Sequence, residues 1–140
     1  MKKIYLLTIV TFICNSILFS QSETKHPIDK QCEACLDSIE NQSTQGIVGC
    51  LWRAATAWDK ELNKYYNLLM GVLDDDEKTK LKNAQKAWLA YKKVETDFYE
   101  TAYSNEEGTM YQEFVAGRAA ALMKVRVMEL KDYYNDLTYQ

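Results

Sequence analysis

Proline occurs once in this 140-residue chain, at Pro27, and this scarcity constrains the fold more than any other feature. Proline interrupts helices because it lacks a backbone N–H and its ring clashes with the preceding turn. Beyond Pro27 the apolar residues recur at spacings of three and four, and no stretch alternates steadily with a period of two. The sequence therefore predicts an all-α fold, with a short N-terminal helix plus three longer helices in an antiparallel helical bundle.

Polar segments set the expected helix boundaries. The first helix starts at Pro27 and stops at the loop "ENQSTQG", in which Ser43 is a suitable N-cap for the second helix. The second helix ends at "DDDEK". Asp74 to Asp76 suit the cap and first turn of a third helix that runs to about Tyr103, because carboxylates there meet free N–H groups. The segment "SNEEG" separates the third helix from the fourth.

The apolar positions of the last two helices predict which faces are buried. On the third helix the predicted face carries Leu81, Ala84, Trp88, Tyr91 and Phe98. On the fourth it carries Tyr111, Phe114, Val115, Leu122, Val125 and Tyr133.

Residues 1–20 have the pattern of a secretory signal peptide. Lys2 and Lys3 precede an apolar run over residues 4–19, which is shorter than the roughly 20 residues of a membrane span. The sequence predicts cleavage after Ser20 and export of one domain, residues 21–140, to the periplasm or the medium. No integral membrane segment would remain after cleavage.

Charge restricts the partners that the exported domain can bind. The whole chain has 17 Lys and Arg against 20 Asp and Glu, a formal charge of −3. Loss of Lys2 and Lys3 leaves 15 basic residues against the same 20 acidic ones, or −5. An acidic domain suits a cationic protein partner and argues against nucleic acid or an anionic membrane surface.

Three cysteines follow the predicted signal peptide. Around the loop between the first two helices, Cys35 is level with Cys50, whereas Cys32 lies about one turn away. An oxidising compartment favours a Cys35–Cys50 disulfide, with Cys32 left over. A zinc site formed by His26 with the three cysteines is the alternative by ligand type. The prediction is a disulfide, with no metal and no cofactor.

Polar residues interrupt the apolar stripes of the third and fourth helices, and a helix hairpin would bring them together. The turn between these helices places Glu95 level with Arg118, and Gln85 near Arg126 and Glu129. Buried polar groups need partners, so these residues are predicted to form a structural network. Its predicted members are Gln85, Lys92, Glu95, Arg118, Arg126 and Glu129. A catalytic acid–base cluster is the alternative, but the chain offers no paired nucleophile and base, so no enzyme is predicted.

Four segments carry a family resemblance: "GCLWRAATAWDKELNKYYNLLM", "LKNAQKAWLAYKKVE", "GTMY" and "VRVMELKDYY". They resemble the LprI-like lysozyme-inhibitor family of small exported helical domains. The resemblance places the family's recurrent positions at Asn63, Gln85, Trp88 and Lys92, and its N-terminal cysteine pair at Cys35 and Cys50. The chain departs from many relatives at Thr96 and Arg118, where those relatives carry a second cysteine pair.

The resemblance implies an exported cell-envelope binding protein that inhibits a lysozyme by non-covalent occlusion, with a cationic lysozyme as its partner. An envelope interaction or scaffold domain without lysozyme activity is the alternative. Two acidic turns are the candidate partner-binding elements, although acidic residues at helix starts also serve as caps. The first turn comprises Asp74, Asp75, Asp76 and Glu77, and the second contains Glu106 and Glu107.

Overall fold

The computed structural model describes residues 25–104 and 109–139, and within these ranges the chain is helical, with no strand. Helix α1 (Pro27–Asp37) leads through a 3₁₀ turn, η1 (Ile39–Asn41), into α2 (Thr44–Val72), α3 (Asp75–Tyr103) and α4 (Met110–Thr138). The predicted all-α architecture of one short and three long helices is confirmed. The predicted signal peptide and the candidate residues Glu106 and Glu107 lie outside the described residues.

Side-chain caps fix where α1, α2 and α3 begin. His26 caps α1 by accepting the backbone N–H two residues on, and Ser43 Oγ accepts the backbone N–H of Gly46 at 3.1 Å. Asp74 and Glu77 form a reciprocal capping box at the start of α3, each carboxylate accepting the other residue's N–H at 2.9 Å. These bonds use N–H groups that have no partner within the helix. The predicted starts of these three helices are confirmed.

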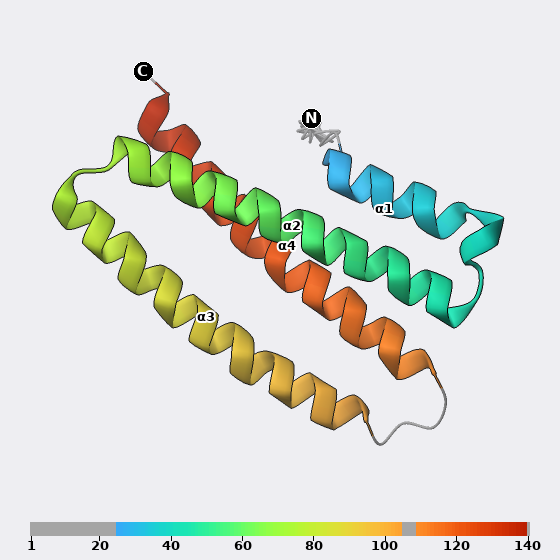
Figure 1. The fold of residues 1–140 in the computed structure, drawn as a ribbon. Helices are drawn as coiled ribbons and strands as arrows, with labels where there is room; N and C mark the ends of the chain where they lie inside the picture. Colours follow the sequence, from blue (N-terminus) through green and yellow to red (C-terminus); the bar gives the residue numbers. More distant parts are fainter. Residues whose placement is uncertain (1–24, 105–108, 140) are drawn as a thin grey trace, which may run out of the picture.

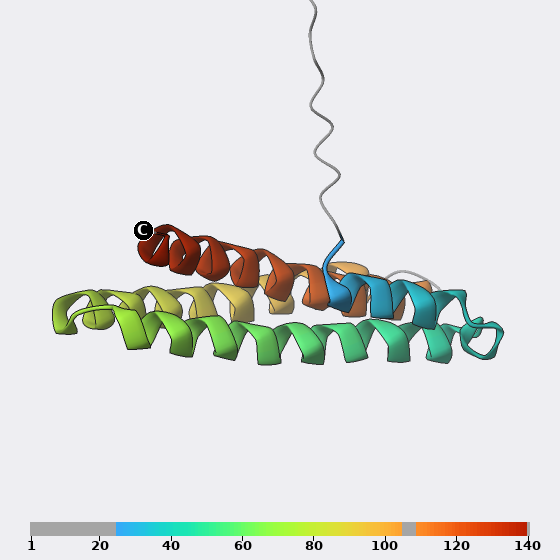
Figure 2. The ribbon, with the colours of Figure 1, turned by 90° about the horizontal axis from the view of Figure 1, so that it is seen from above.

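The helices are arranged around a central pair, α2 and α4, which form the most extensive helix contact. Both run in the same direction, whereas α1 and α3 run the opposite way along the two sides of the pair (Figure 1). Figure 2 shows the same helices from above, where the colours again show that α2 and α4 run in one direction and α1 and α3 in the other. Helix α1 packs on α2, and α3 makes a smaller contact with α4. None of the described helices is long and apolar enough to cross a membrane.

The main core lies between α2 and α4. Its members come from both helices: Trp58, Leu62, Leu69, Met123, Val127 and Leu130. Each such side chain contributes about 1.5–3 kcal/mol when it is removed from water, as an upper estimate. Buried alanines, Ala54 and Ala55 on α2 and Ala116 on α4, leave room for the two backbones to approach. The α2–α4 pair is therefore the rigid centre that positions the other helices.

The buried face of α4 differs from the predicted one. Phe114, Val125 and Tyr133, which the pattern assigned to the core, are at least half exposed. The buried row is instead Ala116, Met123, Arg126, Val127 and Leu130. Helix α4 turns this row toward α2, and the row that carries Phe114, Val125 and Tyr133 consequently faces outward.

Helix α3 is the least buried of the long helices. Only Gln85 and Tyr99 of its 29 residues are buried, although Leu81 and Trp88 pack against the core. Tyr91 and Phe98, which were predicted on its buried face, are exposed. The small contact between α3 and α4 explains this, because much of the predicted apolar face extends beyond the area that α4 covers.

Candidate functional site

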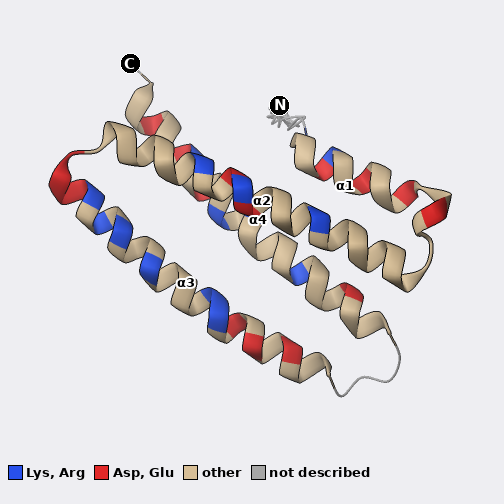
Figure 3. Ribbon diagram, in the orientation of Figure 1, with Lys and Arg blue, Asp and Glu red and all other residues tan. Residues whose placement is uncertain are grey.

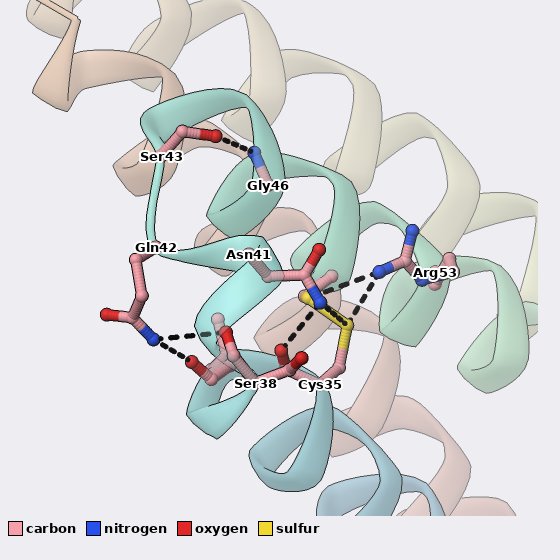
Figure 4. The surroundings of a disulfide bond; sticks show 9 residues. Cys35, Ser38, Asn41, Gln42, Ser43, Gly46 and Arg53 are labelled. Atoms are coloured by element: carbon pink, nitrogen blue, oxygen red, sulfur yellow. Dashed lines mark hydrogen bonds between the residues drawn. A yellow bond between two sulfur atoms is a disulfide. The ribbon is translucent and has the colours of Figure 1, made fainter.

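A disulfide ties the end of α1 to the start of α2. Cys35 and Cys50 are bonded with their Cα atoms 5.8 Å apart, as predicted (Figure 4). The Arg53 guanidinium donates to both sulfurs, with Nη2 at 2.6 Å from Cys35 Sγ and 3.2 Å from Cys50 Sγ. Asn41 Nδ2 donates to the Cys35 carbonyl oxygen at 2.9 Å. The bridge and its polar neighbours therefore fix the η1 turn against both helices.

Of the described cysteines, Cys32 alone has no disulfide partner. Burial raises the pKa of its thiol, and the negative charges of Asp29 and Glu33 raise the pKa further. The thiol therefore stays protonated at neutral pH and is a poor nucleophile.

The zinc alternative does not fit the part of the chain that the structure describes. Cys35 and Cys50 are bonded to each other, and no group of three His, Cys, Asp or Glu side chains is placed to hold a metal within this part. His26 lies against the core, with its ring 4.5 Å from the Trp58 ring.

Part of the predicted polar network joins α3 to α4 in the interior. Arg126 Nε donates to Gln85 Oε1 at 3.1 Å, and Arg126 Nη1 donates to Glu129 Oε2 at 3.0 Å. Gln85 and Arg126 are 9% and 8% exposed, which makes them the buried polar residues of the described chain. Every fully buried side-chain nitrogen and oxygen of the described residues has a hydrogen-bond partner. The structure thus brings together Gln85, Arg126 and Glu129.

The other three predicted members stand apart from this cluster. Lys92 Nζ lies 5.8 Å from the centre of the Trp88 ring, a cation–π distance. Glu95 and Arg118 border the same hollow of about 170 Å³ between α3 and α4 but form no ion pair with each other or with another described residue. The predicted Glu95–Arg118 pair is therefore absent. The helix register brings both residues to one hollow, but their side chains do not form an ion pair.

The acidic turn between α2 and α3 combines capping with exposed charge. Figure 3 shows acidic residues, coloured red, at the start of α3. Asp74 and Glu77 are engaged in the capping box. Asp75 has a fully exposed side chain with a loose contact to Lys78 at 3.7 Å, and Asp76 pairs with Lys80 along the helix surface. Of the four acidic residues of this turn, Asp75 and Asp76 therefore present carboxylates that take no part in the capping box.

A cleft of about 280 Å³ between α2, α3 and α4 was not predicted from the sequence. Its lining combines aromatic, charged and hydroxyl side chains, among them Trp52, Thr56, Asp59, Lys92 and Tyr99. Trp52, Thr56 and Asp59 are spaced by four and three residues, so they form a second stripe on α2 beside the buried one. That spacing could have predicted the stripe itself, but nothing in the sequence indicated that α3 would leave the stripe uncovered.

Comparison with known proteins adds two findings. A family model described as lysozyme inhibitor LprI matches residues 35–130. Among solved structures, the chain is similar to an uncharacterized protein from Burkholderia thailandensis, with 26% sequence identity and a TM-score of 0.75. That similarity covers 81% of this chain and 55% of the other, so the chain spans about half the length of the Burkholderia protein. No match was found among curated proteins.

Proposed function

The chain belongs to the LprI lysozyme-inhibitor family, and we propose that it is an exported cell-envelope protein that inhibits a lysozyme by non-covalent occlusion. The observation that carries this proposal is the family match over residues 35–130, which begins at the disulfide and extends through the whole α2–α4 core. The family description is that of an inhibitor and not of an enzyme, so a protein partner follows from it.

Charge supports a cationic lysozyme as that partner. The chain has a formal charge of −3, and Asp75 and Asp76 project at the tip of the α2–α3 turn. A protruding pair of carboxylates can enter a concave site and meet the donors that line it, and opposite charges speed the encounter. We infer that this turn, comprising Asp74 to Glu77, is the element that approaches the enzyme. The second acidic turn, with Glu106 and Glu107, is the other candidate.

The Cys35–Cys50 disulfide supports export, because such bonds persist in oxidising compartments such as the periplasm. The signal-peptide pattern of residues 1–20 supports the same conclusion and gives an exported domain of residues 21–140.

One observation favours a second candidate function, an envelope interaction domain without lysozyme activity. The recurrent family positions have structural tasks here: Gln85 accepts from Arg126, Trp88 packs on the core, and Asn63 donates to the Asp59 carbonyl oxygen at 2.8 Å. Family membership therefore specifies a scaffold more directly than it specifies a binding surface.

The test of inhibition is lysis of a peptidoglycan suspension by c-type lysozyme with the exported, processed protein added. Protection at micromolar protein is expected, and it should weaken as salt rises, because the Debye length falls from about 10 Å at 0.1 M to about 3 Å at 1 M. Absence of protection with several lysozymes would reject inhibition. A pull-down from envelope extract would then test the second candidate.

Paired charge variants test which surface binds. Asp75→Asn with Asp76→Asn removes two negative charges and leaves the capping box intact, whereas Asp132→Asn with Asp136→Asn makes the same change of net charge near the end of α4. The first pair should raise the half-inhibitory concentration about tenfold, equivalent to about 1.4 kcal/mol, and the second should leave it nearly unchanged. Glu106→Gln with Glu107→Gln is the third arm. Equal effects of all three arms would mean that net charge, and not one turn, governs binding.

A further inference from the structure

One side of the α3–α4 hairpin exposes an apolar surface that the fold leaves uncovered. We call it the hairpin face. On α3 it carries Tyr91, Val94, Glu95 and Phe98, and on α4 Phe114, Arg118, Leu122 and Val125. Phe98, Val94 and Val125 are 67%, 61% and 60% exposed. The α3 residues are spaced by three and four, so they form one stripe along the helix, and Tyr91, Leu122 and Val125 line the hollow between the two helices. Exposed apolar residues gathered on one side of two neighbouring helices are typical of an interaction site.

The charges on the hairpin face limit what can cover it. Glu95 and Arg118 both border the hollow, and neither is ion-paired with a described residue. The neighbouring Lys93 and Asp97 neutralise each other at 2.6 Å. The face therefore carries one unpaired negative and one unpaired positive charge, which cancel. A strongly cationic protein gains no electrostatic attraction from such a surface, in contrast to the acidic turn.

A second copy of the chain fits this arrangement. Two copies with a formal charge of −3 each repel one another over most of their surfaces, but the hairpin face is neutral. A two-fold axis brings the same patch of each copy together, so that residue i contacts residue j and residue j contacts residue i. Glu95 of each copy can then meet Arg118 of the other, while the apolar stripes cover one another.

We propose that the hairpin face is a self-association surface on which two copies pack around a two-fold axis, with Glu95 of each copy paired with Arg118 of the other. The proposal does not depend on lysozyme inhibition. It explains why Glu95 and Arg118 lie at one hollow without joining within a single chain. In such a dimer the second copy also covers apolar residues of α3 that α4 leaves exposed. Within the single chain only two residues of α3 are buried.

Charge reversal tests the pairing across copies. Sedimentation velocity and native mass spectrometry of the processed protein at tens of micromolar should show a dimer. Glu95→Arg alone places two arginines opposite each other, and Arg118→Glu alone places two glutamates opposite each other. Each variant should weaken dimerisation about tenfold or more, because like charges meet at both ends of the interface. Glu100→Arg, the same reversal at an exposed position of α3 off the hairpin face, is the matched control and should leave the dimer intact.

Mixing the two reversed variants distinguishes pairing between copies from pairing within one copy. Glu95→Arg presents only positive charges at these two positions and Arg118→Glu only negative ones, so the two variants in an equimolar mixture should form a heterodimer more tightly than either forms a homodimer. Circular dichroism of each variant, unchanged from the parent protein, checks the fold. A monomeric parent protein would overturn the self-association surface. A dimeric parent whose two variants do not combine, or an equal loss with Glu100→Arg, would overturn the Glu95–Arg118 pairing.

Discussion

Removal of the Gln85 side-chain acceptor should destabilise the protein more than removal of the Glu129 charge. Both residues accept hydrogen bonds from Arg126, at 3.1 Å and 3.0 Å, but their surroundings differ. Gln85 is 9% exposed and joins α3 to α4. The Glu129 side chain is 47% exposed and lies three residues from Arg126 on the same helix. Solvent screens the second contact and not the first.

The magnitudes follow from that difference. Gln85→Leu keeps a similar volume and leaves a buried guanidinium N–H without its acceptor, which costs about 1.5–3 kcal/mol for a hydrogen bond to a charged group. Glu129→Gln removes one half-exposed ion pair, which costs about 0.2–1 kcal/mol. The neutral amide is therefore expected to contribute more than the full charge.

Urea unfolding at neutral pH, followed by tryptophan fluorescence, measures both free energies. All variants should be compared at one protein concentration, because self-association would make the unfolding midpoint depend on concentration. A double-mutant cycle with Arg126→Met completes the test. The double variant Gln85→Leu with Arg126→Met should lose about 1–3 kcal/mol less than the sum of the single losses, since no buried charge is then left unpaired. A Gln85→Leu loss no larger than that of Glu129→Gln, or strictly additive losses, would refute the reasoning.

Two further stability predictions concern the disulfide and the glycines. Replacement of Cys35 and Cys50 together by alanine should lower the free energy of unfolding by about 3 kcal/mol, because the bond closes a loop between residues 15 apart. Urea unfolding measures this loss. Non-reducing peptide mapping of the parent protein verifies the bond. Gly46→Ala would place a Cβ atom 2.6 Å from the Asn41 Cα atom and should lower the free energy of unfolding by about 1–3 kcal/mol. Gly117→Ala would place a Cβ atom with no neighbour within 4 Å and should raise that free energy by about 0.5–1 kcal/mol in the same assay. Equal effects at the two glycines would contradict the close approach of η1 to α2.

The features that the sequence predicted correctly are those set by neighbouring residues. Ser43 and Asp74 place helix starts because each accepts a backbone N–H three positions on. Pro27 does so because its fixed φ and missing N–H suit the first position of a helix. The Cys35–Cys50 bond also follows from a short loop, since two helices joined by a few residues have little freedom in their register.

The features that the sequence did not predict depend on which helices pack against each other. A hairpin model treats α4 as the partner of α3, but α4 packs mainly on α2, which is far from it in the chain. The rotation of α4 toward α2 explains the exposure of Phe114 and Val125. Glu95 and Arg118 border one hollow between α3 and α4 but form no ion pair with each other. Periodicity shows which residues of one helix lie on the same face. It does not show which of two candidate neighbouring helices covers that face.

The positions that resemble the recurrent ones of the family are distinct from those that we propose to decide binding. Gln85 is engaged by Arg126, and Trp88 lies between the core and Lys92, so substitutions at these positions should first change stability. Asp75 and Asp76 have no comparable structural task, because the capping box of α3 is complete without them. Binding measurements on such a protein are informative only for variants whose unfolding free energy is shown to be unchanged.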